Sequence, residues 1–201
     1  ALGQLVHLDF ADGIAVHPLR MTLSGRFILF DSLQRKDTLE VLSRSKQPTL
    51  EGLRLLAPQG VHSIRDFYDH PEWRDKTAAL PPDIRRRVEA NIDNYAIQRE
   101  AYGLLCQGQL DDEALGALLT RHHTNLRDGL GISTPAIERI LDTALAHGAL
   151  GGKFNGSGGG GCLFVYARQR DCENILEAVR REGYPGMITS QDGGLQIVAH
   201  A

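Results

Sequence analysis

The sequence has few cysteines and no long apolar run. Its three cysteines, Cys106, Cys162 and Cys172, are an odd number and lack Cys-x-x-Cys spacing. This excludes a simple disulfide framework and a cysteine-rich zinc site, and it favours a reducing, cytoplasmic location. No apolar stretch approaches the roughly 18 residues that a transmembrane helix needs, and no signal peptide is visible. We therefore expect no membrane partner.

An excess of charge of either sign is also missing. Lys and Arg number 22 against 25 Asp and Glu, which gives a formal net charge of -3. Phosphate neutralisation requires a basic face, so nucleic acid is not expected as the main ligand. Hydrophobic residues make up 42% of the 201 positions, as in an ordinary globular protein of one large or two small domains.

The beginning of the chain reads as three short strands, at residues 5–10, 14–19 and 26–30, with turn residues between the first two. Three short strands beside a bare terminus make a poor domain alone. Either they pack on the rest of the chain or their sheet lacks upstream strands. In the second case exposed strand edges would pair between copies, so a homodimer is possible.

Helical periodicity dominates the middle of the chain. Apolar residues recur at helical spacing in segments 38–45, 49–56, 83–96, 111–126, 135–147 and 171–181. Ser133, Thr134 and Pro135 form a good helix start, with a hydroxyl cap followed by proline in the first turn. The run of Arg85, Arg86 and Arg87 is interpreted as a solvated helix surface.

Strands return in the last third, at 162–167, 187–189 and 195–198, the last two as a hairpin around residues 192–194. Segments 171–181 and 135–147 would lie on one face of the resulting antiparallel sheet. This order indicates an α+β fold.

A glycine run separates the strand that ends near Asn155 from the strand that begins at Cys162. Five of its six positions are glycine: Gly156, Ser157, Gly158, Gly159, Gly160 and Gly161. The run matches G-x-G-x-x-G formally, but a dinucleotide motif leaves a strand and opens a helix, whereas here a strand comes next. No Lys-Ser or Lys-Thr follows the glycines, so the run is not a Walker A loop. Such a hairpin lets backbone N–H groups approach an anion closely, and we favour that role over a flexible tip.

The stretch GALGGKFNGSGGGGC at residues 148–162 resembles the third conserved motif of the GHMP kinases, the galacto-, homoserine, mevalonate and phosphomevalonate kinases. The preceding NLRDGLGISTPAI at 125–137 resembles the same region of galactokinase-like members. Residues 1–10 resemble the segment just after the family's catalytic Asp. The family's Gly-x-Gly-Leu-Ser-Ser-Ser loop, its early sugar-contacting motif and the Asp segment are not found in these 201 residues.

The resemblance implies the C-terminal half of an ATP-dependent small-molecule kinase. Residues 1–36 would be the last strands of the N-terminal kinase domain, and residues 37–201 a ferredoxin-like C-terminal domain with helical additions. ATP and Mg would be bound mainly by the N-terminal half, a required partner. No catalytic and no metal residue is expected in this chain, so we expect it to be inactive when isolated.

The glycine loop would lie near the transferred phosphate, and Ser157 would add a hydroxyl or merely form a turn. Lys153 is expected to face solvent rather than an anion. Asp31, Ser32 and Arg35 resemble the turn near the sugar. Residues 39–46 lack the Tyr that galactokinases place there, and residues 35–42 look closer to the heptose-phosphate and fucose kinase branch. His122 and His123 are expected to pack rather than react.

Two alternatives stay open. The chain could be a non-catalytic ferredoxin-like module that senses a ligand or binds a protein, because fold alone does not decide function. A nucleic-acid-binding module is less favoured, although Phe164 and Tyr166 lie two apart on one strand as an RNA-binding sheet would require.

Overall fold

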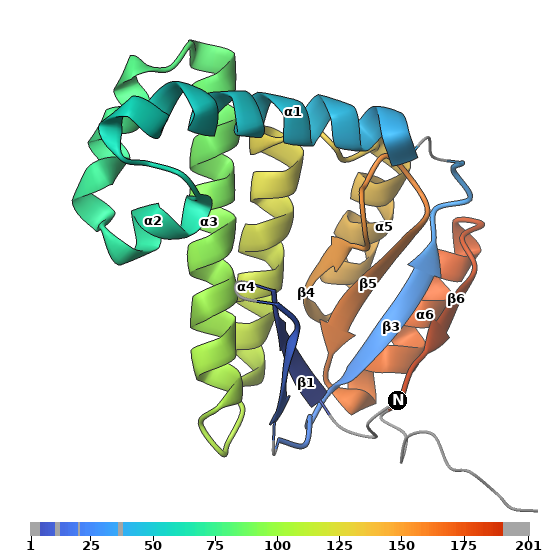
Figure 1. The fold of residues 1–201 in the computed structure, drawn as a ribbon. Coiled ribbons are helices and arrows are strands. Elements are labelled where there is room, and N and C mark those ends of the chain that lie inside the picture. The colour runs from blue at the N-terminus through green and yellow to red at the C-terminus, as the bar shows by residue number, and fades with distance from the viewer. Residues whose placement is uncertain (1–4, 11–12, 20, 36–37, 191–201) are drawn as a thin grey trace, which may run out of the picture.

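The computed structural model describes residues 5–10, 13–19, 21–35 and 38–190, and Figure 1 shows their arrangement. A small ribbon of two strands, a four-stranded sheet backed by two helices, and a group of longer helices make up this part of the chain. None of its helices is long and apolar enough to cross a membrane.

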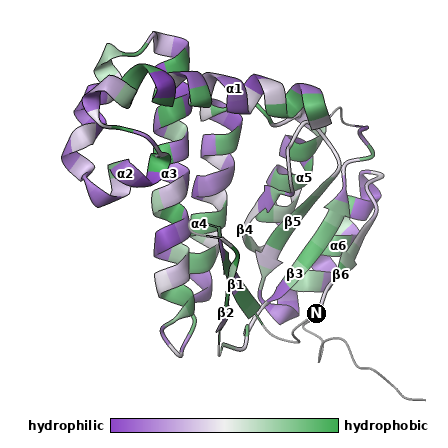
Figure 2. Ribbon diagram, viewed as in Figure 1, coloured by the Kyte–Doolittle hydropathy of each residue, from purple (hydrophilic) through white to green (hydrophobic). Residues whose placement is uncertain are grey.

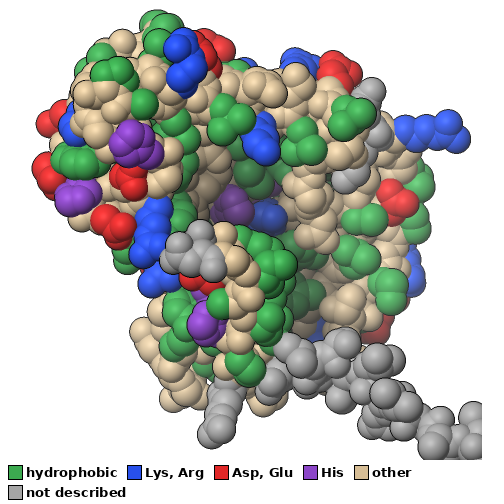
Figure 3. Space-filling view, in the orientation of Figure 1, with side chains coloured by type: hydrophobic (Ala, Val, Ile, Leu, Met, Phe, Trp, Pro, Cys, Tyr) green, Lys and Arg blue, Asp and Glu red, His purple; other side chains and the backbone are tan. Residues whose placement is uncertain are grey.

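The first two strands form a ribbon of their own. β1 (Leu5–Asp9) pairs antiparallel with β2 (Ala15–Leu19), which confirms the prediction of these strands. One face of the ribbon turns toward the helices, where the ring of His7 lies 4.2 Å from that of Tyr102. The opposite face is apolar and open to solvent (Figures 2 and 3). Its exposed members are Val6, Leu8, Phe10, Ile14 and Val16.

This apolar face leads to a prediction of self-association. Leu8 is 47% exposed and pairs across the ribbon with Val16, which is 44% exposed. We expect the chain to dimerise or aggregate at high concentration, and Leu8→Lys to reduce this. Leu39→Lys on α1 is a matched control, because Leu39 is 81% exposed and lies outside the ribbon. Light scattering that shows a sharp monomer at high concentration would count against the prediction.

The main sheet contains the other four strands. β3 (Arg26–Asp31), β4 (Ala149–Phe154), β5 (Cys162–Ala167) and β6 (Gly186–Ile188) lie in the order β4-β5-β3-β6, and all neighbours are antiparallel. α5 (Pro135–Ala146) precedes β4, and α6 (Cys172–Arg181) joins β5 to β6. This is the strand order of a ferredoxin-like fold, so the predicted α+β class and architecture are confirmed.

The placement of β3 corrects one expectation. The strand at residues 26–30 was expected to belong with the first two strands, inside an N-terminal unit that ends at residue 36. Instead it pairs with β5 and β6 in the main sheet. The physical reason is its continuous apolar run, since Ile28 and Phe30 are fully buried against the helices behind the sheet.

The core of the sheet is built by the face that α5 and α6 cover. α5 begins as predicted, with the Thr134 hydroxyl accepting from the Ile137 N–H and Pro135 in the first turn. Ile137 and Ile140 from α5 and Ile175 and Val179 from α6 are fully buried against Leu163 and Val165 of β5. Tyr166, on the opposite face, is also fully buried, which argues against an RNA-binding sheet with exposed aromatics.

Helices fill the long connection between β3 and α5. They are α1 (Thr38–Leu56), α2 (Ile64–Asp69), α3 (Pro82–Leu105) and α4 (Asp112–Thr124). Single turns of 3₁₀-helix cover Ala57–Gln59 and Gln169–Asp171, a longer one covers Pro71–Ala79, and a π-turn at Asn125–Gly129 follows α4. A second core joins α1, α2 and α3 through Leu56, Val61, Phe67, Leu80, Val88 and Ile92.

α1 differs from the two separate helical segments that were predicted. It runs unbroken across Pro48, although proline removes the N–H that would bond to the carbonyl of residue 44. The Arg87 Nε donates to that Arg44 carbonyl at 3.3 Å. The Arg87 side chain is therefore only 15% exposed, and the interpretation of Arg85 to Arg87 as a solvated surface fails at Arg87.

Near the end of the chain, β6 pairs with β3. The second strand of the predicted hairpin, at residues 195–198, lies outside the described residues.

Candidate functional site

The glycine run is the hairpin that joins β4 to β5, as predicted. Gly156, Gly158, Gly159, Gly160 and Gly161 all have positive φ angles, between 70° and 132°. Residues with a side chain rarely adopt this region. The composition of the loop is thus explained by its backbone conformation.

The loop is tied to two other segments rather than free at its tip. The Gly159 N–H donates to the Ile132 carbonyl at 2.9 Å, and the Gly161 N–H donates to the Gln34 carbonyl at 3.0 Å. The N–H groups of Ser157, Gly158 and Gly160 donate to no acceptor within the described part of the chain. The loop is therefore held in shape while keeping unused backbone donors, as an anion-binding nest requires.

The turn between β3 and α1 lies directly against the loop. The Ser32 N–H donates to the Gly161 carbonyl at 3.0 Å. The Asp31 carboxylate accepts from the Leu33 N–H at 2.9 Å, and Leu33 has a φ of 56°, unusual for a residue with a side chain. Backbone strain of this kind concentrates at functional sites.

The structure thus brings all the sequence-predicted site residues into one region. Ser32 is buried, whereas Asp31 and Arg35 are exposed beside the loop. Within the described part of the chain, the Ser157 hydroxyl bonds only to the neighbouring Gly158 carbonyl, at 3.5 Å. The sequence did not single out Gln34, whose side-chain oxygen accepts from the Thr134 hydroxyl at 2.5 Å. This bond links the turn to the start of α5.

Lys153 lies on β4, the strand that enters the loop. Its side chain was expected to face solvent, but it is partly buried. Its ammonium donates to the Phe154 carbonyl at 2.8 Å and lies 5.4 Å from the Phe164 ring centre. Burial lowers the pKa of Lys153. Lys153 pairs directly with Phe164 on β5 and therefore shares a half-buried aromatic face, a pairing that the sequence alone does not reveal.

His123 supports the region from α4. Its Nε2 lies 2.8 Å from the Glu138 carboxylate, which also binds Arg127 at 3.1 Å and the Ser133 hydroxyl. Burial opposes ionisation of Glu138, but these hydrogen bonds outweigh it and lower its pKa. A buried histidine with a fixed partner fits the expected packing role and fixes α4 against the start of α5.

His122 predicts a loss of stability in acid. Burial first, and then nearby Lys153 and His123, lower the pKa of His122 to about 4 from an ordinary 6.5. Between pH 6.5 and 4 the His122 side chain binds a proton in the unfolded chain but not in the folded chain. The free energy of unfolding therefore falls as pH falls. The slope is at most about 1.4 kcal/mol per pH unit.

Urea unfolding at pH 7, 5.5 and 4.5 tests this prediction. We expect His122→Gln to flatten the acid loss between pH 7 and 4.5, because glutamine does not titrate. His62→Gln, at an exposed histidine before α2, should keep the wild-type slope. Equal slopes for all three proteins would contradict the assignment to His122.

Comparison with known proteins identifies the fold. Residues 101–185 match the family model described as GHMP kinases C terminal. This stretch of the chain is therefore similar to the C-terminal domain of the GHMP kinases. The match spans α4, α5, β4, the glycine loop, β5 and α6.

Among the similar proteins, the galactokinase of Streptomyces coelicolor is 34% identical over 125 residues, which cover 60% of this chain and 31% of that enzyme. The mevalonate kinase of Thermococcus onnurineus is 38% identical over 94 residues, 44% of this chain and 28% of that enzyme. The chain thus spans only about a third of the length of these curated kinases.

In structure, the Lactococcus lactis galactokinase complexed with galactose superimposes with a TM-score of 0.74 at 17% identity. That match covers 96% of this chain and 51% of the Lactococcus enzyme. The mevalonate kinase of L. major gives a TM-score of 0.60 at 18% identity, covering 88% of this chain and 44% of that enzyme. At such identities these matches show the fold.

Proposed function

We propose that this chain forms part of an ATP-dependent kinase that transfers a phosphoryl group to a hydroxyl of a sugar or related small molecule. The observation that carries the proposal is the glycine loop, which is anchored to Ile132 and Gln34 while the N–H groups of Ser157, Gly158 and Gly160 donate to no acceptor among the described residues. The galactokinase and mevalonate kinase relatives support the reaction class. The sugar class rests on the galactokinase similarity and on the β3–α1 turn.

Phosphoryl transfer depends mainly on positioning and on stabilising negative charge. The backbone N–H groups of Ser157, Gly158 and Gly160 would hold phosphate oxygens, and the short loop would allow close approach. Arg35 would add a positive charge from the adjacent turn, and Asp31 would accept from a substrate hydroxyl. The strained Leu33 turn would fix these two side chains relative to the loop.

The residues present fit a nucleotide phosphate, because the loop offers unpaired donors in a fixed conformation. When bound, ATP supplies the phosphoryl group. No group of three or more His, Cys, Asp or Glu side chains among the described residues could hold a metal ion, although a kinase Mg needs only one or two carboxylates besides the substrate phosphates. The expected Mg therefore stays a prediction.

We further propose a cytoplasmic location and an N-terminal kinase half as partner, the source of the catalytic base and of the main ATP loop. On this proposal the 201 residues alone would be inactive. Because β3 belongs to the main sheet, only the β1–β2 ribbon is still proposed to belong to the N-terminal half.

ADP release tests the function. The chain should be expressed within the longest reading frame that contains it, and assayed with galactose, fucose, a mannoheptose phosphate and mevalonate. Turnover with one acceptor is the expected result and would name the substrate. A folded protein that turns over none of them and does not bind Mg-ATP would support the non-catalytic module instead.

A further inference from the structure

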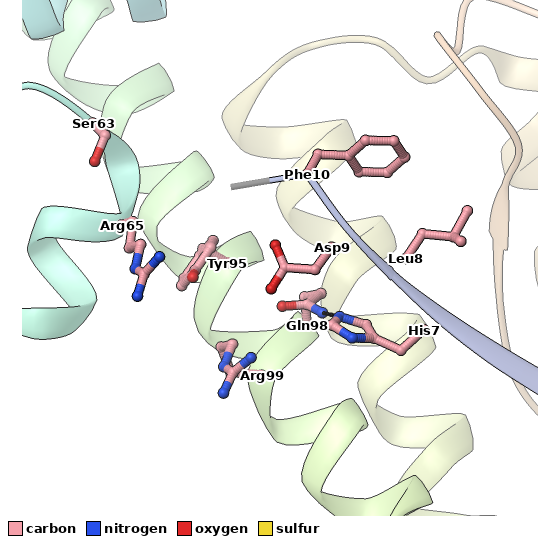
Figure 4. Close-up of a pocket in the computed structure, with 9 residues that line it drawn as sticks. All are labelled: His7, Leu8, Asp9, Phe10, Ser63, Arg65, Tyr95, Gln98 and Arg99. Atoms are coloured by element: carbon pink, nitrogen blue, oxygen red, sulfur yellow. Dashed lines mark hydrogen bonds between the residues drawn. The ribbon is translucent and has the colours of Figure 1, made fainter. Parts of the chain in front are cut away.

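A cavity lies away from the glycine loop, between the end of β1 and helices α2 and α3. Its volume is about 550 Å³, within the range of small-molecule sites. It shares no lining residue with the glycine loop or the β3–α1 turn. Figure 4 shows Arg65, Tyr95, Gln98, Arg99 and Asp9 turned toward a common space, whereas Leu8 and Phe10 point away from it.

Two guanidinium groups give this cavity its charge. Arg99 lies beside the rings of Tyr68 and Tyr102, at 5.8 and 5.5 Å, and it forms no ion pair within the described part of the chain. Among the described residues Arg65 pairs only with Asp69, at 3.3 Å, and it is half exposed. Both can therefore take a ligand anion, and guanidinium geometry suits the oxygens of a phosphate.

The position of His7 in the cavity wall is fixed by Gln98. Its Nε2 lies 2.7 Å from the Gln98 Nε2, so the amide donates to the ring and the ring proton sits on Nδ1. That Nδ1 is buried and has no hydrogen-bond partner among the described residues. This Nδ1 is closed to solvent, so His7 shapes the wall of the cavity and is not counted among the groups that contact a ligand.

The remaining polar groups suit hydroxyls. The two oxygens of the Asp9 carboxylate can each accept hydrogen bonds, and the Gln98 oxygen and the Tyr95 hydroxyl are further acceptors. The ring of Tyr95 beside these groups suits the apolar face of a sugar ring. The Asp9 charge lowers affinity for a bare anion, which favours a ligand that carries hydroxyls as well as negative charge.

We propose that this cavity binds a phosphate ester of a polyhydroxy compound, at a site separate from the glycine loop. The phosphate contacts Arg99 and Arg65, and the hydroxyls contact Asp9 and Gln98. The site is formed entirely within these 201 residues, so it can be tested independently of kinase activity.

Calorimetric titration of the 201-residue chain with glucose 6-phosphate, glucose and inorganic phosphate tests the proposal. We expect glucose 6-phosphate to bind at least about tenfold more tightly than phosphate, and glucose not to bind at about 10 mM. Arg99→Gln should weaken glucose 6-phosphate about tenfold or more. Arg65→Gln, at a half-exposed residue that the fold does not need, should weaken it in the same direction. Arg139→Gln, at an exposed arginine of α5, is the matched control.

Asp9→Asn separates hydroxyl recognition from simple charge attraction. It should weaken glucose 6-phosphate but strengthen inorganic phosphate, because it removes both an acceptor and a repelling charge. The proposal is overturned if neither probe binds, if both arginine variants bind like Arg139→Gln, or if Asp9→Asn strengthens both probes alike.

Discussion

Replacing Gly158 with alanine is expected to lower the free energy of unfolding by about 2–5 kcal/mol. Gly158 has a φ of 78°, and a side chain in that region costs about 1–2 kcal/mol. A Cβ there would also lie 2.5 Å from the Ile132 carbonyl oxygen and 2.9 Å from two ring atoms of Phe154. Overpacking of this kind costs about 1–3 kcal/mol more. Urea unfolding followed by circular dichroism measures the change.

Gly131→Ala is the matched control for this prediction. Gly131 has a φ of 68°, but nothing lies within 4 Å of the Cβ position. Only the conformational cost applies, so we expect a loss of about 1–2 kcal/mol. Equal losses for Gly158→Ala and Gly131→Ala would show that the loop is not packed against Ile132 and Phe154 as described.

Replacing Gly151 with alanine is expected to have the largest effect on stability, a loss of more than about 3 kcal/mol. Gly151 of β4 faces Gly116 of α4, and an added Cβ would meet the Gly116 carbonyl. Both contacting groups are backbone, so neither side can turn away, and α4 must move from the sheet. The same movement would displace His122 and His123 from Lys153.

Gly103→Ala is a control that should change the free energy of unfolding in the opposite direction. Gly103 lies in α3, and nothing lies within 4 Å of its Cβ position. Alanine is the better helix former by about 0.5–1 kcal/mol, so this variant should gain stability by that amount. A Gly151→Ala protein with wild-type stability would contradict the close packing of α4 on β4.

The sequence predicted much of the fold because the local signals were strong. Thr134 and Pro135 marked the start of α5, and the apolar run at β5 marked a central strand. The sequence could not assign β3 to its sheet. A short apolar strand has the same residue pattern in either domain, and only its pairing with distant strands determines which sheet it joins. The sequence also divided α1 at Pro48, since the compensating bond from Arg87 to the Arg44 carbonyl joins residues far apart in sequence.

The candidate site was predicted in part for the same reasons. Glycine composition identified the loop, because backbone positions with positive φ angles favour glycine. The anchors Ile132 and Gln34 were not predicted, since both act through backbone carbonyls that any residue supplies. Lys153 was expected in solvent because its cover, Phe164, comes from the neighbouring strand.

The most direct test of the central claim is amide chemical-shift mapping of Mg-ATP binding on the kinase-length protein. We predict that the largest shifts fall on the amides of Ser157, Gly158 and Gly160, whose N–H groups are unused. The Gly159 and Gly161 amides, already bonded to carbonyls, should shift less. Shifts confined to other parts of the chain, with these three amides unchanged, would contradict a phosphate-binding role for the loop.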